Sequence, residues 1–339
     1  MEKIAFIYGN TFIYWNSVVL TLAAGVAICL FLAFYLRDGK KLAAAVAVPL
    51  ALVLSVFFGR LFHWYFRPDS YTGFIKAMTD YTTGGYALMG CFAACGATAG
   101  ILKLLGLEKH PARMLDAMSL AGSGAIALGR LACFTNSADR GGILPEGTVF
   151  GGSVVSAATG TVEYRLNTFL LQSAAAGVIF LILLVLYFAR RREYHRRPGD
   201  LFWLFCLYYG GSQAVLDSTR TDSIFFQFNG FVGVVQVLGL CAVVLTLVCF
   251  TVRYLKTGGK KLGAAALWAV CLLFLGGAVY MEYYVQRHGT QALFAYSAMS
   301  ICMGVTLILG TVLWSATRSR EIPRSMPTVY ESMVQGDFR

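Results

Sequence analysis

Arg130 lies in an apolar run, residues 113–135, that is long enough to cross a bilayer as a helix. An arginine inside such a helix is energetically costly near the bilayer centre, so it marks a candidate functional site. Its planar guanidinium group can pair bidentately with a phosphate or a carboxylate. The sequence therefore predicts an anionic partner for Arg130, and a phospholipid phosphate is the anion that a membrane supplies.

A second apolar run, residues 201–219, carries polar side chains at helical spacing. Tyr209, Gln213 and Asp217 are four residues apart, and Arg220 follows three residues later. Residues at this spacing share one face of a helix, so all four are predicted to line one stripe. The alternative is structural: Asp217 only pairs with Arg220, and Arg220 reaches out to the membrane surface.

Further polar residues are expected at the same depth of the membrane. Arg60 and His63 lie near the end of the run 42–66, and Asn136 follows the run that contains Arg130. Buried polar groups need partners, which favours a shared pocket. The predicted headgroup-binding residues are Arg60, Arg130, Asn136, Gln213 and Arg220. His63 is a candidate general base, although a histidine beside Trp64 and Tyr65 also fits the aromatic belt at a membrane surface.

These residues would be positioned by membrane-spanning helices. The 339 residues are 58% hydrophobic and 13% charged, with a mean hydropathy of +0.65. This composition predicts an all-α polytopic membrane protein. Nine spans are expected, at residues 17–36, 42–66, 84–107, 113–135, 166–189, 201–219, 230–254, 262–285 and 293–316.

The net charge of +11 follows membrane topology and is no indication of nucleic-acid binding. With the N-terminus outside, 19 of the 28 Lys and Arg residues fall on the inner side, seven outside and two within spans. This asymmetry follows the positive-inside rule. It predicts an external N-terminus and a cytoplasmic C-terminus.

No metal site or cleaved leader is expected. All nine cysteines lie within apolar runs, and Cys91 and Cys95 are one helical turn apart. Neither a histidine nor another thiol accompanies this pair in sequence, so small packing residues are the favoured interpretation. Residues 1–16 lack a basic region followed by a cleavable apolar core, so the first span is expected to stay uncleaved.

The connecting segments suggest a division into a core and an addition. Residues 1–255 form the seven-span core, residues 256–316 two additional spans, and residues 317–339 a cytoplasmic, disordered tail. The Gly-rich loop 136–165 is either a mobile lid or substrate-contacting loop, or a plain flexible connector. A small transporter with a polar conduit is a further alternative for the function. Many transporters contain internal repeats, and none is visible in this sequence, which argues against it.

Several ordered pieces of the chain resemble one family of membrane enzymes. In chain order they are Tyr14-Trp15, Gly59-Arg60-Leu61, Arg67-Pro68, Gly84-Gly85, Asp116, Gly129-Arg130-Leu131, Phe134, Asn136, Tyr209-Gly210, Asp217, Arg220 and Gln236. Over about residues 1–255 the chain resembles the bacterial prolipoprotein diacylglyceryl transferases. The resemblance implies seven core spans with an external N-terminus, in the bacterial cytoplasmic membrane.

The resemblance also implies roles for individual residues. Arg130 and Arg220 would bind the lipid phosphate, Tyr209 and Asn136 would line the site, and Asp217 stands where the family has glutamate. The chain departs from the family pattern at five places, one of which is residues 163–172, where the family segment His-Pro-Ser-Gln-Leu-Tyr-Glu is not recognisable. Met89 replaces a histidine, Gln213 an arginine and Cys133 an asparagine, and Asn136-Ser137-Ala138 replaces Asn-Gly-Glu.

The reaction implied by the family moves diacylglyceryl from phosphatidylglycerol, or another anionic phospholipid, to a cysteine thiol of a prolipoprotein signal peptide. Such a site needs cations for the leaving phosphate and a base for the thiol, without a cofactor. The predicted catalytic residues are Arg130, Tyr209, Asp217 and His63. A relative that binds phospholipid without turnover and acts through a partner is the second alternative.

Overall fold

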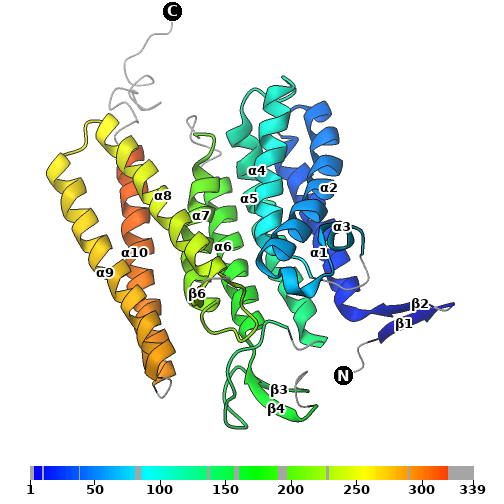
Figure 1. Cartoon of the computed structure of the whole chain (residues 1–339). Coiled ribbons are helices and arrows are strands. Elements are labelled where there is room, and N and C mark those ends of the chain that lie inside the picture. Colours follow the sequence, from blue (N-terminus) through cyan, green and yellow to red (C-terminus); the bar gives the residue numbers. More distant parts are fainter. Residues whose placement is uncertain are drawn as a thin grey trace, which may run out of the picture.

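The computed structural model describes residues 4–9, 11–37, 39–80, 85–135, 138–155, 160–189, 197–226, 229–288 and 291–319. Within these ranges the chain is a bundle of long helices with small β-hairpins at one end (Figure 1). The α-helices are α1 (Trp15–Tyr35), α2 (Lys41–Phe66), α3 (Phe74–Thr79), α4 (Leu88–Leu104), α5 (Pro111–Arg130), α6 (Thr168–Ala189), α7 (Asp200–Leu216), α8 (Val234–Lys256), α9 (Lys261–His288) and α10 (Ala292–Ser319).

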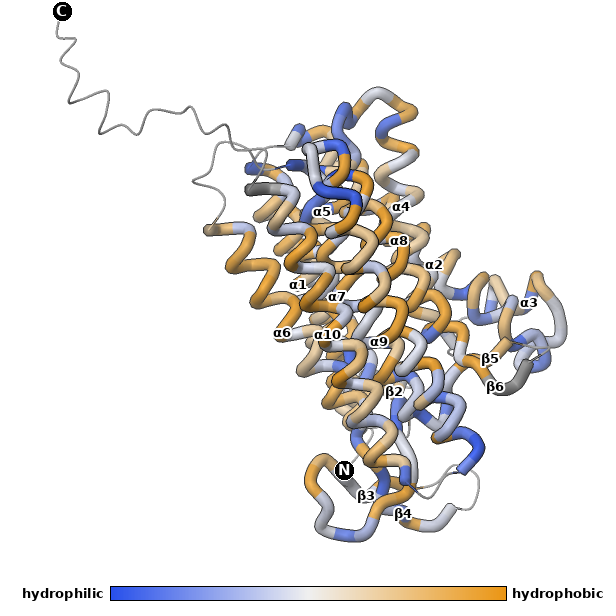
Figure 2. The backbone as a smooth tube through the Cα atoms, turned by 90° about the vertical axis from the view of Figure 1, so that its left-hand side faces the viewer, coloured by the Kyte–Doolittle hydropathy of each residue, from blue (hydrophilic) through white to orange (hydrophobic). Residues whose placement is uncertain are grey.

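The predicted all-α membrane fold is confirmed. Each of the nine predicted spans corresponds to one helix, and seven helices of the described chain are long and apolar enough to cross a membrane: α1, α2, α5, α6, α8, α9 and α10. The other two, α4 and α7, have 17 residues each. At about 1.5 Å per residue they reach the lower limit for a span. Figure 2 shows the hydrophobic middle of the bundle between more hydrophilic ends.

The helices pack mainly in neighbouring pairs. These pairs are α1 with α5, α2 with α4, α5 with α6, α7 with α8, and α9 with α10. In Figure 1, α9 and α10 form one side of the bundle and α1 and α2 the other, with α5, α6 and α7 between them. The central position of α5 and α7 brings the two predicted polar helices close together.

Glycines permit the closest of these helix contacts. A Cβ atom on Gly90 of α4 would lie 2.4 Å from the backbone nitrogen of Gly59 in α2. A Cβ atom on Gly210 of α7 would lie 2.7 Å from the carbonyl oxygen of Gly239 in α8. Small residues allow such backbone approach in membrane helices. Two of these glycines, Gly59 and Gly210, precede or follow candidate site residues, so close packing helps to fix the site.

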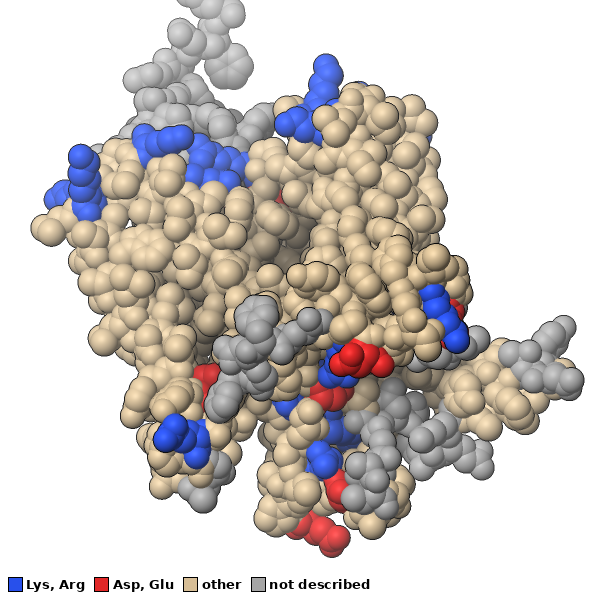
Figure 3. Space-filling view, in the orientation of Figure 1, with Lys and Arg blue, Asp and Glu red and all other residues tan. Residues whose placement is uncertain are grey.

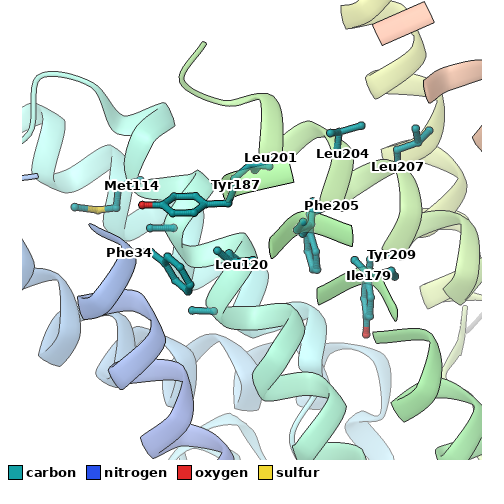
Figure 4. Packing of buried hydrophobic residues seen from close by; sticks show 14 of the residues in the cluster. Phe34, Met114, Leu120, Ile179, Tyr187, Leu201, Leu204, Phe205, Leu207 and Tyr209 are labelled. Atoms are coloured by element: carbon teal, nitrogen blue, oxygen red, sulfur yellow. The ribbon is translucent and has the colours of Figure 1, made fainter. Parts of the chain in front are cut away.

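The main buried apolar cluster includes side chains of α1, α2 and α4 to α10, and many of them come from α1, α5, α6 and α7. Its buried side chains include Phe34, Leu120, Tyr187, Leu204 and Phe205. Figure 4 shows these rings and branched side chains meeting at the centre of the bundle, with Tyr209 just beyond Phe205. The Tyr209 ring stacks on that of Phe205, with centroids 5.1 Å apart. The core therefore ends at a candidate site residue.

Three two-stranded antiparallel hairpins lie outside the spans. They are β1 (Ile4–Tyr8) with β2 (Thr11–Tyr14), β3 (Gly151–Val155) with β4 (Val162–Leu166), and β5 (Phe225–Phe226) with β6 (Asn229–Gly233). The β3–β4 hairpin falls in the loop 136–165, for which the sequence predicted either a lid or a plain connector. The two strands pair with Gly151 opposite Leu166 and Val155 opposite Val162, a pairing that is compatible with both predictions.

The two ends of the bundle carry different sets of charged side chains. Figure 3 shows Lys and Arg side chains gathered at the end where α8 meets α9, whereas basic and acidic side chains lie together at the hairpin end. At the basic end, Asp116 accepts hydrogen bonds from the backbone nitrogens of Gly199 (2.7 Å) and Phe202 (2.9 Å). A carboxylate at the first turn of α7 satisfies amides that lack helical partners. Asp116 therefore anchors the start of the helix that carries Tyr209 and Gln213.

Candidate functional site

The site is centred on Arg130, the last residue of α5. A 3₁₀ turn, Leu131–Thr135, follows it and brings the chain back toward the bundle. Arg130 Nη1 lies 2.5 Å from Asp139 Oδ2, and the guanidinium group also donates a hydrogen bond to the Tyr209 hydroxyl. Its Nε is buried and has no hydrogen-bond partner among the described residues. The anionic partner that the sequence predicted for Arg130 is, in this structure, a protein carboxylate.

Arg220 approaches the same carboxylate from the end of α7. Its Nη2 lies 2.6 Å from Asp139 Oδ1, so the two arginines hold the two oxygens of one carboxylate. Arg220 also pairs with Asp217 through Nη1 (3.3 Å) and with Asp222 through Nε (3.0 Å). All three donor nitrogens of Arg220 are thus used, and it does not extend to the membrane surface. Only an arginine offers donors in this fork geometry.

Asp139 is the central residue of the cluster. It is 6% exposed and has a φ of +54°, a left-handed conformation that is uncommon outside glycine, asparagine and aspartate. Burial acts to raise the pKa of Asp139, but the charges of Arg130 and Arg220 outweigh it and lower the pKa below its ordinary value. The Cys133 thiol lies 3.2 Å from Asp139 Oδ2. An ionised carboxylate, two guanidinium groups and a thiol therefore meet at one point.

Backbone pairing fixes the segment that carries Asp139. The backbone nitrogen of Gly141 donates to Leu166 O of β4 (2.8 Å), and that of Thr221 donates to Arg140 O (3.0 Å). The Asp139 nitrogen donates to Asp222 Oδ2 (3.0 Å). The segment 138–143 therefore lies between the β3–β4 hairpin and the turn that carries Arg220.

The stripe predicted on α7 is buried, and its members have different partners. Asp217 is 1% exposed, and its Oδ2 has no hydrogen-bond partner within the part of the chain that the structure describes. Gln213 is 2% exposed and accepts a hydrogen bond from Gln172 Nε2 of α6 (3.2 Å), while its own Nε2 has no partner. Buried polar atoms without partners are costly, which is a reason to expect a bound group near them. Tyr209, Asp217 and Arg220 join the Arg130 cluster, and Gln213 lies one turn away from Asp217.

Arg60 has a different environment from the one predicted. It is 1% exposed and donates to the backbone oxygens of Ala77 (2.6 Å), Gly85 (3.1 Å) and Asp80. Its guanidinium group also lies 4.8 Å from the Tyr71 ring centroid. Arg60 is buried, and within the described part of the chain its hydrogen bonds go to the connection between α2 and α4 and not to the Arg130 cluster. Its donors hold the segment that connects α2 to α4.

His63 belongs to the same region as Arg60. Its Nδ1 is 2.8 Å from the Tyr71 hydroxyl, and the two rings meet edge to face with centroids 5.7 Å apart. No contact joins His63 to Arg130 or Asp139 among the described residues. The nearest link is Arg67, which donates to the backbone oxygens of Asp222 (2.8 Å) and Ser223 (3.1 Å). The structure thus divides the predicted residues into two groups, at the α5–α7 ends and at the α2 end.

Other residues of the prediction and of the structure do not coincide. Asn136 lies outside the described residues, and Met89, at the histidine position, is half-buried in the first turn of α4. A surface hollow beside α3, lined by residues between Thr72 and Thr79, contains none of the predicted residues.

Sequence reasoning missed Asp139, Asp222 and Gln172. Asp139 and Asp222 lie in loops, where no periodicity marks them, while Gln172 was visible as a glutamine inside an apolar run.

This fold and this cluster define a polytopic membrane protein with paired arginines at one end of its central helices. The family model for prolipoprotein diacylglyceryl transferase matches residues 3–252. The chain therefore belongs to the prolipoprotein diacylglyceryl transferase family, as the sequence motifs predicted. A search of curated proteins gave no match. The matched range ends within α8, so α9 and α10 lie beyond it.

Proposed function

We propose that the protein transfers diacylglyceryl from phosphatidylglycerol to the cysteine thiol of a prolipoprotein signal peptide in the bacterial cytoplasmic membrane. Membership of the family supports this type of activity in general. The observation that carries the proposal is the convergence of Arg130 and Arg220 on two oxygens of one anion, at 2.5 Å and 2.6 Å. Two phosphate oxygens offer the same kind of bidentate acceptor.

In the proposed reaction the thiolate sulfur attacks the glyceryl carbon that carries the phosphate. A carbon–sulfur bond forms, the carbon–oxygen bond breaks, and glycerol phosphate leaves. Arg130 and Arg220 stabilise the charge on the leaving phosphate, a contribution that preorganised donors supply without reorganisation. The buried Tyr209 hydroxyl faces the Arg130 guanidinium group and helps to orient it.

The thiol proton needs an acceptor within this cluster. Asp217 is the favoured base because its Oδ2 is buried and has no hydrogen-bond partner, while Oδ1 is held by Arg220. A base must lie within hydrogen-bond reach of the proton that it takes, and Asp217 is closer to the arginines than His63 is to either. His63 is not favoured as the base, because it lies at the end of α2, where its Nδ1 pairs with the Tyr71 hydroxyl. Arg130 and Arg220 are already paired with the carboxylates of Asp139, Asp217 and Asp222. A phosphate that binds both arginines must therefore take the place of the Asp139 carboxylate.

The charge balance also favours a second candidate, a relative that binds phospholipid without turnover and acts through a partner. Asp139 pairs with both arginines in the structure, and Met89, at the position of the family's histidine, cannot accept a proton. These two features weaken binding of the leaving phosphate and proton transfer. They do not remove the arginine pair that would hold a headgroup.

The deciding experiment is a transfer assay on purified protein, with labelled phosphatidylglycerol and a peptide that contains a lipobox cysteine. We expect lipidated peptide from the parent and none from Arg130→Ala. The matched control is Arg253→Ala, which breaks a 2.8 Å ion pair with Asp200 at the opposite end of the bundle. Turnover by Arg130→Ala at the parental rate would contradict the role of Arg130. Binding of phosphatidylglycerol that depends on Arg130, without transfer, would support the second candidate.

A further inference from the structure

The two helices beyond the family match contact the turn that carries the site. Ser218 Oγ donates to Glu282 Oε2 of α9 at 2.5 Å. The Tyr296 hydroxyl of α10 donates to the Ser218 carbonyl oxygen at 3.2 Å. Ser218 stands directly after Asp217 and two residues before Arg220. One residue of the site turn is therefore held by its side chain and its backbone, from two different helices.

This turn needs support from outside its own helix. The last α-helical residue of α7 is Leu216, and the carbonyls at a helix C-terminus lack intrahelical partners. Tyr296 takes up one carbonyl of the turn, and Glu282 takes the serine hydroxyl in a charge-assisted bond. Gln286 donates to the second Glu282 oxygen at 2.7 Å, which fixes the direction of the carboxylate.

Apolar packing holds α9 and α10 against this half of α7. A second buried cluster joins residues of the three helices: Ala214, Val215, Leu275, Ala278, Met299 and Met303. Further along α7, the Tyr208 hydroxyl and Thr311 Oγ1 lie 2.8 Å apart. Figure 1 shows α9 and α10 side by side at one edge of the bundle, with α10 next to α8. The hairpin of α9 and α10 is thus docked along α7, and among the described residues its hydrogen bonds to the site turn are made at Ser218.

We propose that Glu282 is a positioning residue for the site: through Ser218 it fixes the turn 217–220 and so the placement of Asp217 and Arg220. The activity part of this inference rests on the proposed function. Its structural part does not, because the order of the turn can be measured without any substrate. The two helices beyond the family match then have a defined role, which is to brace the end of α7 that bears the charged cluster.

The test compares three variants of the full-length protein in nanodiscs. Glu282→Ala removes the acceptor, whereas Glu282→Gln keeps a side-chain oxygen for Ser218. Thr311→Val removes a hydrogen bond between the same hairpin and α7, but away from the site. Amide hydrogen exchange of peptides that cover residues 216–223 reports the order of the turn, and the transfer assay gives kcat and KM for phosphatidylglycerol.

For Glu282→Ala we expect exchange in residues 216–223 to be about tenfold faster than in the parent. We also expect kcat to fall about tenfold with KM within twofold, because a positioning residue acts on the transition state more than on ground-state binding. Glu282→Gln should restore both quantities to near the parental values, and Thr311→Val should change neither. Parental exchange in Glu282→Ala would overturn the inference. If the parent gives no transfer, the proposed function fails, whereas the exchange result still decides the role of Glu282.

Discussion

Arg130 Nη1 and Asp139 Oδ2 lie 2.5 Å apart, so the arginine at the end of α5 is neutralised by a residue of the loop that directly follows it. A 3₁₀ turn, Leu131–Thr135, follows Arg130, and Asp139 has a left-handed backbone conformation with its carboxylate against the end of the helix. Arg220 takes the other oxygen of the same carboxylate. The arginine pair that we propose for a lipid phosphate is therefore already assembled around an anion.

Replacement of Asp139 by asparagine should destabilise the protein at neutral pH. It removes the negative charge between two guanidinium groups whose side chains are each 14% exposed. Breaking such a buried pair costs about 3–5 kcal/mol in soluble proteins. We expect the Tm of Asp139→Asn in nanodiscs to fall by several degrees, while Asp69→Asn, at an exposed aspartate, stays at the parental value. An unchanged Tm for Asp139→Asn would show that the ion pair contributes nothing to stability.

The effect of Asp139 on stability should depend on pH in a defined direction. Arg130 and Arg220 hold the folded-state pKa of this carboxyl below its ordinary value of 3.8. The stabilisation is therefore complete above the unfolded-state pKa and is lost as the pH falls through the lower folded-state pKa. The difference in Tm between the parent and Asp139→Asn should be constant from pH 8 to about pH 5 and shrink below about pH 4. A difference that grows in acid would contradict this assignment.

Substitution of Arg220 by lysine should impair transfer strongly although the charge is kept. Arg220 directs three nitrogens at Asp139, Asp217 and Asp222, and a lysine ammonium cannot reproduce this fork. Loss of one preorganised donor costs about a hundredfold in kcat at comparable sites. We expect a decrease of about this size for Arg220→Lys. Arg287→Lys, at an exposed arginine of α9, serves as the control and should retain the parental rate.

The sequence predicted the helices well because length and hydropathy mark a membrane span without any tertiary information. The sequence also predicted that Arg130, Tyr209, Asp217 and Arg220 lie at one depth in the membrane. Helical spacing and the alternating direction of successive spans determine the depth of a residue. It did not identify Asp139, whose contact with the arginines depends on the conformation of a loop. Nor could it tell that the donors of Arg60 are taken by backbone oxygens of the α2–α4 connection, since that needs the path of the chain.

The α2–α4 crossing provides a test of the fold itself. In Gly90→Ala the new methyl group would lie 2.4 Å from the backbone of Gly59 and Phe58, so the two helices must move apart. In Gly96→Ala, on the same helix, the methyl group meets nothing within 4 Å. We expect the Tm of Gly90→Ala to fall by about 5 °C or more and that of Gly96→Ala to match or exceed the parent, because alanine favours helix. Equal Tm values for the two variants would contradict the close crossing.

Substitutions of Gln172 and Gln213, which are paired in the bundle, can distinguish a structural role of these glutamines from a ligand-binding role. Gln172 Nε2 donates to Gln213 Oε1 at 3.2 Å, and the remaining side-chain amide atoms, Gln172 Oε1 and Gln213 Nε2, are buried without partners. Replacing one glutamine by methionine leaves the other amide unsatisfied, which costs about 1–3 kcal/mol, whereas replacing both can be nearly neutral. We therefore expect each single variant to have a lower Tm than the parent and the double variant to recover it.

The same double variant shows what the unpartnered amide atoms do. If Gln213 Nε2 binds the phospholipid headgroup, as predicted from the sequence, the double variant should be as stable as the parent but bind phosphatidylglycerol about tenfold more weakly, the loss expected for about one hydrogen bond to a charged group. Lipid binding is measured by titration of phosphatidylglycerol into protein held in zwitterionic nanodiscs. Parental affinity in a fully stable double variant would remove Gln213 from the headgroup site and leave Arg130 and Arg220 as its binding residues.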